Sequence, residues 1–165
     1  MLTVRDLYPQ GREYGSSIYN MAGLKLQTRV SQEVEGKEVV YNRFFRYDDF
    51  GRLTDIEQEV EGDTRNGRVN IVSYGYDGDG NLATELIHNV AELREFTYNI
   101  RGQLLSSVAS RENGFSYYLS YDLPYSSMSS PRYDGGISEV GWCHDVYGNY
   151  GQAYFYEYDD NGRIR

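Results

Sequence analysis

The sequence predicts an all-β protein built from stacked antiparallel β-hairpins in a strongly twisted sheet. The main observation is a short motif, recurring six times, in which tyrosine is followed by aspartate or asparagine and then by glycine. A second is the alternation of large apolar residues at Phe115, Tyr117, Leu119 and Tyr121, which is typical of half-buried strands. A third is the small number of prolines, three in 165 residues, which leaves such strands uninterrupted.

The recurring motif has the chemistry of a tight turn. Asp or Asn at the first turn position accepts hydrogen bonds from backbone amides that follow it, and Gly at the fourth position takes a left-handed conformation. Such a turn closes a β-hairpin. Four clean copies occupy residues 47–53, 76–82, 98–104 and 158–164, and two looser copies begin at Tyr19-Asn20 (with Gly23) and Tyr133-Asp134 (with Gly136). The predicted turn formers are Asp48, Gly51, Asp77, Gly80, Asn99, Gly102, Asp159 and Gly162.

The strands between these turns follow from the same patterns. They are predicted over residues 24–34, 38–47, 52–61, 68–77, 82–90, 93–98, 103–110, 115–122, 137–143 and 152–158. The Ser-rich stretch from Leu123 to Pro131 lacks a strand pattern, and we expect an ordered excursion or a mobile loop there. A helix over 82–95 is the alternative for that stretch, because its leucine and valine residues have some i, i+4 spacing.

Composition excludes several classes of function. The net charge of −9 argues against binding to nucleic acid or to an anionic membrane surface, since both require basic patches. No apolar run approaches the roughly 20 residues that cross a bilayer, and the first residues do not resemble a secretory signal peptide. The 18 tyrosines combine apolar area with a polar tip, which suits a sheet packed on one side and wetted on the other.

The turn motif resembles the consensus of the RHS or YD-repeat family, which is close to Tyr-x-Tyr-Asp-x-x-Gly-Arg-Leu. Residues 45–53 and 156–164 match it almost residue for residue, and the segment 98–104 followed by 133–142 is similar to the core of large bacterial RHS proteins. The resemblance covers residues 19–165, which leaves 1–18 as an N-terminal extension or lead-in strand. No Asp-Pro dipeptide occurs, so the self-cleavage element of that family cannot be carried over.

The resemblance implies a spiral of β-hairpins that forms part of a hollow shell in a secreted or surface bacterial protein, used to enclose or display a toxin. We therefore expect a structural, non-catalytic protein without a cofactor. Its expected partners are the remaining repeats of a larger parent chain and an enclosed toxin domain. An alternative from another class is a cell-surface module that binds carbohydrate by stacking sugar rings on exposed tyrosines. The candidates for that role are Tyr117, Tyr118, Tyr147, Tyr150 and Tyr154.

Three constellations could carry chemistry, and each has a plainer interpretation. The run from Asp77 to Asn81 begins like an EF-hand calcium loop, but Leu82 and His88 stand where that loop needs glycine and glutamate. Cys143, His144 and Asp145 have the residue types of a thiol hydrolase, yet neighbours on a strand point to opposite faces. The 25 acidic residues could include a glycosidase-like pair, but nothing selects one. No metal site is predicted.

The last predicted strand, near 152–158, is expected to be a sheet edge. Tyr154, Tyr156 and Tyr158 would present a partly exposed row there. Unpaired amides and carbonyls at such an edge promote pairing with another chain. We therefore expect self-association through this edge, or coverage of it by the N-terminal segment.

Overall fold

The structure is a computed structural model that describes residues 2–6, 12–34, 36–88, 91–111, 114–144 and 151–164. The chain divides into two compact units. Unit 1 comprises Met1–Tyr74 and Leu86–Val90, and unit 2 comprises Gly75–Glu85 and Ala91–Arg165.

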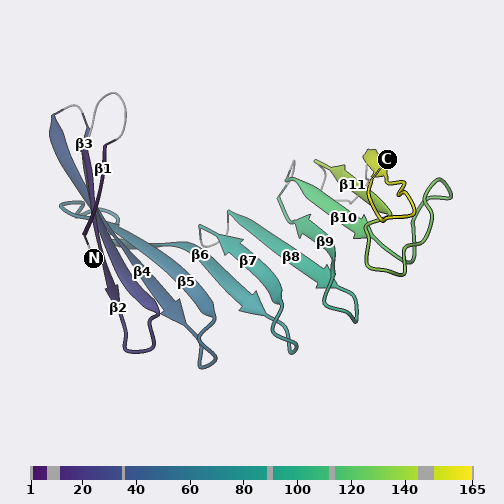
Figure 1. Ribbon diagram of the computed structural model, residues 1–165. Helices are drawn as coiled ribbons and strands as arrows, with labels where there is room; N and C mark the ends of the chain where they lie inside the picture. Colours follow the sequence, from purple (N-terminus) through teal and green to yellow (C-terminus); the bar gives the residue numbers. More distant parts are fainter. Residues whose placement is uncertain are drawn as a thin grey trace. The chain divides into compact units, whose positions relative to one another are not determined.

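The described residues form strands, turns and irregular segments, with no helix among them, and therefore none that could cross a membrane. The strand order in the sheet follows the order along the chain (Figure 1), and the pairs whose register is defined are antiparallel. The strands are β1 (Leu2–Asp6), β2 (Arg12–Tyr19), β3 (Lys25–Val34), β4 (Lys37–Tyr47), β5 (Leu53–Val60), β6 (Arg68–Tyr76), β7 (Leu82–Ile87), β8 (Glu92–Tyr98), β9 (Leu104–Ala109), β10 (Ser116–Ser120), β11 (Glu139–Cys143) and β12 (Gln152–Phe155). The predicted all-β fold of antiparallel hairpins is confirmed.

The strand predictions hold with three corrections. The helical alternative over 82–95 is wrong, since β7 and β8 lie there. The final strand is shorter than predicted, because β12 ends at Phe155 and Tyr158 makes a separate bridge with Ile164. Residues 1–18, expected to be an extension or one lead-in strand, contribute to two strands, β1 and β2.

The sheet of unit 1 has an apolar and a polar face. Side chains alternate between faces along a strand, and the register puts Val30, Tyr41, Phe45, Ile56 and Val72 on one face. We call this the apolar face. The opposite, polar face carries Asn42, Arg46, Asp55, Glu57 and Glu59. The β2–β3 and β4–β5 turns lie at the same end of their strands (Figure 1).

Cross-strand contacts stabilise the polar face. Glu57 on β5 pairs with Arg46 on β4 at 3.0 Å and with Arg68 on β6 at 3.7 Å. The Arg68 guanidinium also lies 3.5 Å from the centre of the Phe44 ring, a cation–π contact. Among the described side chains of this unit, Val30 and Val72 are the buried apolar ones, so backbone ladders and neighbouring side chains supply much of its stability.

Unit 2 has a more substantial core. Its buried residues gather on β9, β10 and β11 and include Ala109, Tyr118, Ser120, Glu139 and Cys143. The irregular stretch between β10 and β11 provides the cover, and we call its residues 121–138 the covering segment. The predicted excursion at 123–131 lies inside it and contains no strand.

Candidate functional site

The four clean motifs adopt the same turn. In the first, Asp48 Oδ1 accepts hydrogen bonds from the amides of Phe50 at 3.0 Å and Arg52 at 2.9 Å, while the Gly51 amide donates to the Asp48 carbonyl at 3.0 Å. The turns that begin at Asp77, Asn99 and Asp159 repeat these bonds. The fourth-position glycines have the predicted positive φ: 78° at Gly51, 88° at Gly80, 73° at Gly102 and 74° at Gly162.

The fifth turn residue completes the unit with its side chain. Asp48 Oδ2 accepts a hydrogen bond from Arg52 Nε at 2.7 Å, and Asp159 pairs with Arg163 in the same way at 2.9 Å. Where the first residue is the amide Asn99, its Nδ2 donates to Gln103 Oε1 at 2.8 Å. The sequence analysis did not predict this side-chain pairing of the first and fifth positions. The spacing of Asp48 and Arg52 in the sequence would have indicated it.

The two looser motifs differ from each other. Asn20 makes the same turn, because its Oδ1 accepts from the Leu24 amide at 2.9 Å and Gly23 has a φ of 81°. At Asp134 the turn is altered: its Oδ1 accepts from the Gly136 amide at 3.1 Å, but the positive φ of 91° belongs to Gly135. The expectation that Gly136 is the turn glycine is therefore wrong.

The hydrogen bonds of the turns lower the pKa of their carboxyl groups. The pKa of Asp77 is lowered mainly by the side-chain amide of Asn81, and the pKa of Asp159 mainly by the backbone amide of Arg163. In each case the donors stabilise the charged carboxylate. The acidic groups of the turns thus serve the backbone conformation.

Three of the motif tyrosines connect their hairpin to the preceding motif turn through the ring hydroxyl. Tyr47 donates to the Lys25 carbonyl at 2.8 Å, Tyr98 to the Leu82 carbonyl at 2.9 Å and Tyr158 to the Ile137 carbonyl at 2.8 Å. In every case the acceptor is the residue that directly follows the preceding turn. We call these contacts the tyrosine links. The pKa of Tyr98 is raised, chiefly by burial, as the hydroxyl of a packed ring requires.

A further tyrosine link, made by Tyr121, was not predicted from the sequence. Tyr121, at the start of the covering segment, donates to the Leu104 carbonyl at 3.2 Å and is only 8% exposed. The signal was present as the dipeptide Tyr121-Asp122, but no glycine follows at turn spacing. The tyrosine position of the motif is thus more widespread than the complete turn.

The acidic run that resembles a calcium loop is occupied by turn hydrogen bonds. Asp77 Oδ1 accepts from the amides of Asp79 and Asn81, and Asp77 Oδ2 accepts from Asn81 Nδ2 at 3.0 Å. Three of the roughly four acceptor sites of this carboxylate are therefore used within the turn. Among the described residues, no three His, Cys, Asp or Glu side chains converge as metal ligands would.

The covering segment is fastened to β10 and β11 by a buried carboxylate. Glu139 is 1% exposed, accepts a short hydrogen bond from the Tyr118 hydroxyl and accepts another from the Ser126 amide at 3.2 Å. Tyr125 packs edge-on against the Tyr118 ring, with centroids 4.6 Å apart. A Cβ added at Gly141 would overlap the Tyr118 ring, so glycine is required opposite this tyrosine. This cluster, the Glu139 clasp, was not predicted.

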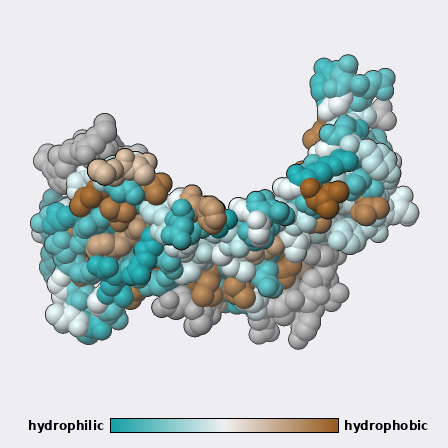
Figure 2. Space-filling view, turned by 90° about the horizontal axis from the view of Figure 1, so that it is seen from below, coloured by the Kyte–Doolittle hydropathy of each residue, from teal (hydrophilic) through white to brown (hydrophobic). Residues whose placement is uncertain are grey.

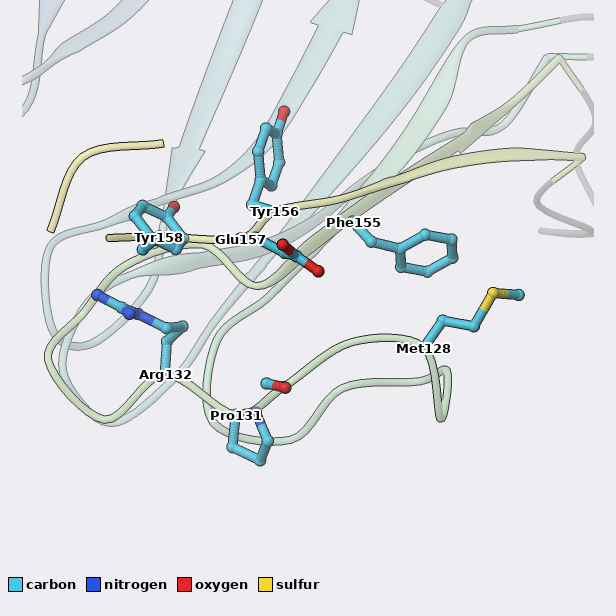
Figure 3. Close-up of a pocket in the computed structure, with 8 residues that line it drawn as sticks. Met128, Pro131, Arg132, Phe155, Tyr156, Glu157 and Tyr158 are labelled. Atoms are coloured by element: carbon cyan, nitrogen blue, oxygen red, sulfur yellow. The ribbon is translucent and has the colours of Figure 1, made fainter. Parts of the chain in front are cut away.

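A groove of about 500 Å³ lies between the covering segment and the end of β12 (Figure 3). Met128 and Pro131 line one side, and Phe155 and Glu157 line the other. Arg132 also borders it, but its guanidinium is ion-paired with Asp134 and stacked 4.1 Å from the centre of the Tyr158 ring. The Arg132 guanidinium thus contacts Asp134 within the covering segment and Tyr158, the residue before the 159–163 turn.

Of the predicted carbohydrate-stacking tyrosines that the structure describes, Tyr117 and Tyr154 share a sheet face with Trp142, whereas Tyr118 does not. Tyr118 is 6% exposed inside the Glu139 clasp, so its assignment to an exposed platform is wrong. Tyr147 and Tyr150 lie outside the described residues. Tyr154 is 62% exposed and its ring lies 4.9 Å from Trp142, which is opposite Tyr117 in the β10–β11 register. In the view of Figure 2, apolar side chains form small separate groups among polar ones.

The remaining candidates are dispersed. Cys143 is buried at the end of β11, whereas His144 is exposed and lies 5.3 Å from the Phe115 ring; Asp145 lies outside the described residues. His88 is exposed at the β7–β8 connection, with a φ of 47° and its amide bonded to the Ile71 carbonyl. The described part of the chain thus brings none of these groups into a nucleophile–base pair.

Comparison with known proteins adds no family: no protein-family model matches the sequence, and no curated protein matches it.

Proposed function

We propose that the chain is a structural, non-catalytic series of hairpins that forms part of a β-shell of the RHS or YD-repeat type, in a secreted or cell-surface protein. The observation that carries this proposal is the tyrosine link, since Tyr47, Tyr98 and Tyr158 each tie their hairpin to the preceding turn in the same way. A device that repeats along the chain builds an extended array by nearest-neighbour contacts. Toxin enclosure or display is what the resemblance adds.

The two faces of the unit 1 sheet support a wall role. One face carries the ion pairs of Glu57 and the other carries apolar side chains such as Phe45 and Ile56, so the two faces suit different surroundings. The carboxylates of Asp48 and Asp77 and the hydroxyl of Tyr47 form hydrogen bonds with backbone groups, so they stabilise the fold.

A cysteine-labelling experiment tests this proposal. Arg43 and Arg46 are both exposed on β4 but lie on opposite faces, so Arg43→Cys and Arg46→Cys form a matched pair; the native Cys143 is buried. In the 165-residue chain both new thiols should react with a maleimide that carries a bulky polymer. In the natural protein that contains this chain, a shell should block one of the two. Equal reaction at both sites in the natural protein would contradict the shell.

Carbohydrate binding is a second candidate, favoured by the exposed Tyr154 ring beside Trp142. Aromatic rings in this position could stack on sugars. Soluble polysaccharides titrated into the chain should then quench Trp142 fluorescence, and Tyr154→Ala should abolish the effect. The absence of quenching with every polysaccharide tried would remove this candidate.

A further inference from the structure

Within the described residues, the outer edge of β12 has backbone groups that face away from β11 in a defined pattern. In the described part of the chain, β12 has one neighbour, β11. The Tyr156 amide donates to the Ser138 carbonyl at 3.0 Å, so it points toward β11. Because N–H and C=O point in opposite directions across a planar trans peptide, the Phe155 carbonyl points away from β11. Alternation along the strand then directs the N–H and C=O groups of Ala153 and Phe155 outward.

This edge lacks the features that keep strand edges apart in other proteins. Charged residues, proline and bulges are the usual protection. The residues Gln152–Phe155 include no charge and no proline, and the β11–β12 register has no shift, whereas the β2–β3, β4–β5 and β8–β9 registers each contain one. Tyr154 and Phe155 are also 62% and 37% exposed. As far as the described residues go, the edge is therefore open to another strand.

We propose that β12 pairs with β12 of a second copy of this chain, antiparallel about a two-fold axis at Tyr154. Ala153 then lies opposite Phe155 of the second copy, and the reverse, so both outward-facing residues exchange hydrogen bonds. If the register between the two copies shifted by two residues, Phe155 would lie opposite residue 151 or Ala153 opposite residue 157. Both 151 and 157 lie outside β12. The proposal rests on the β12 edge alone and is independent of the shell function.

The side chains match in this register. The two Tyr154 rings meet at the axis on the face that carries Trp142, and aromatic cross-strand pairs are favourable. On the other face, the large Phe155 lies beside the small Ala153. Glu157, the acidic residue nearest to the strand, lies opposite Gly151 of the second copy, so no like charges oppose one another. The contact is short, and we expect a weak, reversible dimer.

Sedimentation equilibrium of the full chain tests the dimer. With rising concentration the wild-type mass should increase toward twice the 19.0 kDa of one chain. Ala153→Pro removes an outward N–H without affecting a bond to β11, so it should keep the strand signature by circular dichroism and remain monomeric; Ala153→Ser, the matched control, should dimerise like wild type. A wild-type chain that stays monomeric at every concentration would overturn the proposal.

Disulfide crosslinking tests the proposed β12–β12 register. It does not depend on whether the Ala153→Pro variant folds. Directly opposed residues of a pair without mutual hydrogen bonds lie within disulfide reach, so Tyr154→Cys should oxidise to a covalent dimer. Gln152→Cys places its thiol on the same face, but opposite Tyr156 of the second copy. The two thiols introduced at position 152 are then four residues out of register, and this variant should crosslink at least tenfold more slowly. Equal crosslinking of the two variants, or none by Tyr154→Cys, would refute the two-fold register.

Discussion

At the residue scale, the fourth position of each turn is the most constrained. Gly78 and Gly80 provide a comparison within one turn, because Gly80 has a φ of 88°, whereas Gly78 has no positive φ and no atom within 4 Å of an added Cβ. Left-handed backbone costs a residue with a Cβ about 1 kcal/mol or more. The chemistry of the turn thus predicts opposite outcomes for two neighbouring glycines.

We expect Gly80→Ala to lower the free energy of unfolding by about 1 kcal/mol and Gly78→Ala to leave it unchanged or slightly raised, since alanine reduces the entropy of the unfolded chain. Urea unfolding followed by circular dichroism measures both. Equal effects of the two substitutions would mean that φ at position 80 is not the constraint.

The turn carboxylates give the protein an acid sensitivity with a definite sign. Their pKa values are lower in the folded state than in the unfolded state. Such groups stabilise the fold fully at neutral pH, and this contribution is lost as the pH falls from about 4 through the lower folded value. Stability should therefore decline in acid.

Asp77→Asn tests this cause. The Asn99–Gln103 pair shows that an amide can hold the first position when the fifth side chain accepts a hydrogen bond, and Asn81 can do so by rotating its amide. The variant should fold, and its urea midpoint should fall less between pH 7 and pH 3 than that of wild type. An unchanged fall would remove Asp77 from the acid response.

At the element scale, the tyrosine links hold successive hairpins together. Tyr98→Phe keeps the ring and removes the hydroxyl that donates to the Leu82 carbonyl. Loss of one such bond should cost about 1 kcal/mol, and Tyr133→Phe, at a tyrosine that is 71% exposed, should cost little. Chemical unfolding compares the two variants. If Tyr98→Phe left the free energy of unfolding unchanged, the ring and not its hydroxyl would connect the hairpins.

The Glu139 clasp holds the covering segment in place. Tyr118→Phe leaves Glu139 buried with one donor fewer, which should cost about 1 to 3 kcal/mol and expose residues 123–131 to proteases. Adding Glu139→Gln removes the buried charge and should restore part of the loss. Limited proteolysis with mass spectrometry measures the cleavage. Cleavage of the double variant as fast as Tyr118→Phe alone would show that the charge of Glu139 is not involved.

Local chemistry made the turns and most strands predictable. The positive φ at Gly51 and Gly162 followed from the Asp-x-x-Gly spacing, because that geometry depends on a few consecutive residues. The Glu139 clasp was not predictable, since it joins Tyr118, Ser126 and Glu139 through a segment with no periodic pattern. The burial of Tyr118 depends in turn on a glycine 23 positions away, at Gly141. The C-terminal end of β12 was mispredicted because the alternation of tyrosines continues past Phe155, where pairing with β11 stops.

At the scale of the whole molecule, the described strands pair in the order in which they occur along the chain. Pairing joins strands that are consecutive in the sequence, and within each unit the tyrosine links of Tyr47, Tyr98, Tyr121 and Tyr158 join a hairpin to the motif turn before it. Stability in such arrays is a sum of local and nearest-neighbour terms.

A turn and a tyrosine link recur along the chain and join consecutive strands. The most direct test is an NMR measurement of contacts between the α-protons of opposed residues, together with the coupling constants of the turn glycines. We expect contacts between sequence neighbours such as β4 and β5 or β8 and β9, and left-handed values at Gly23, Gly51, Gly80, Gly102 and Gly162. Contacts between strands that are not consecutive, or helical values at these glycines, would contradict the claim.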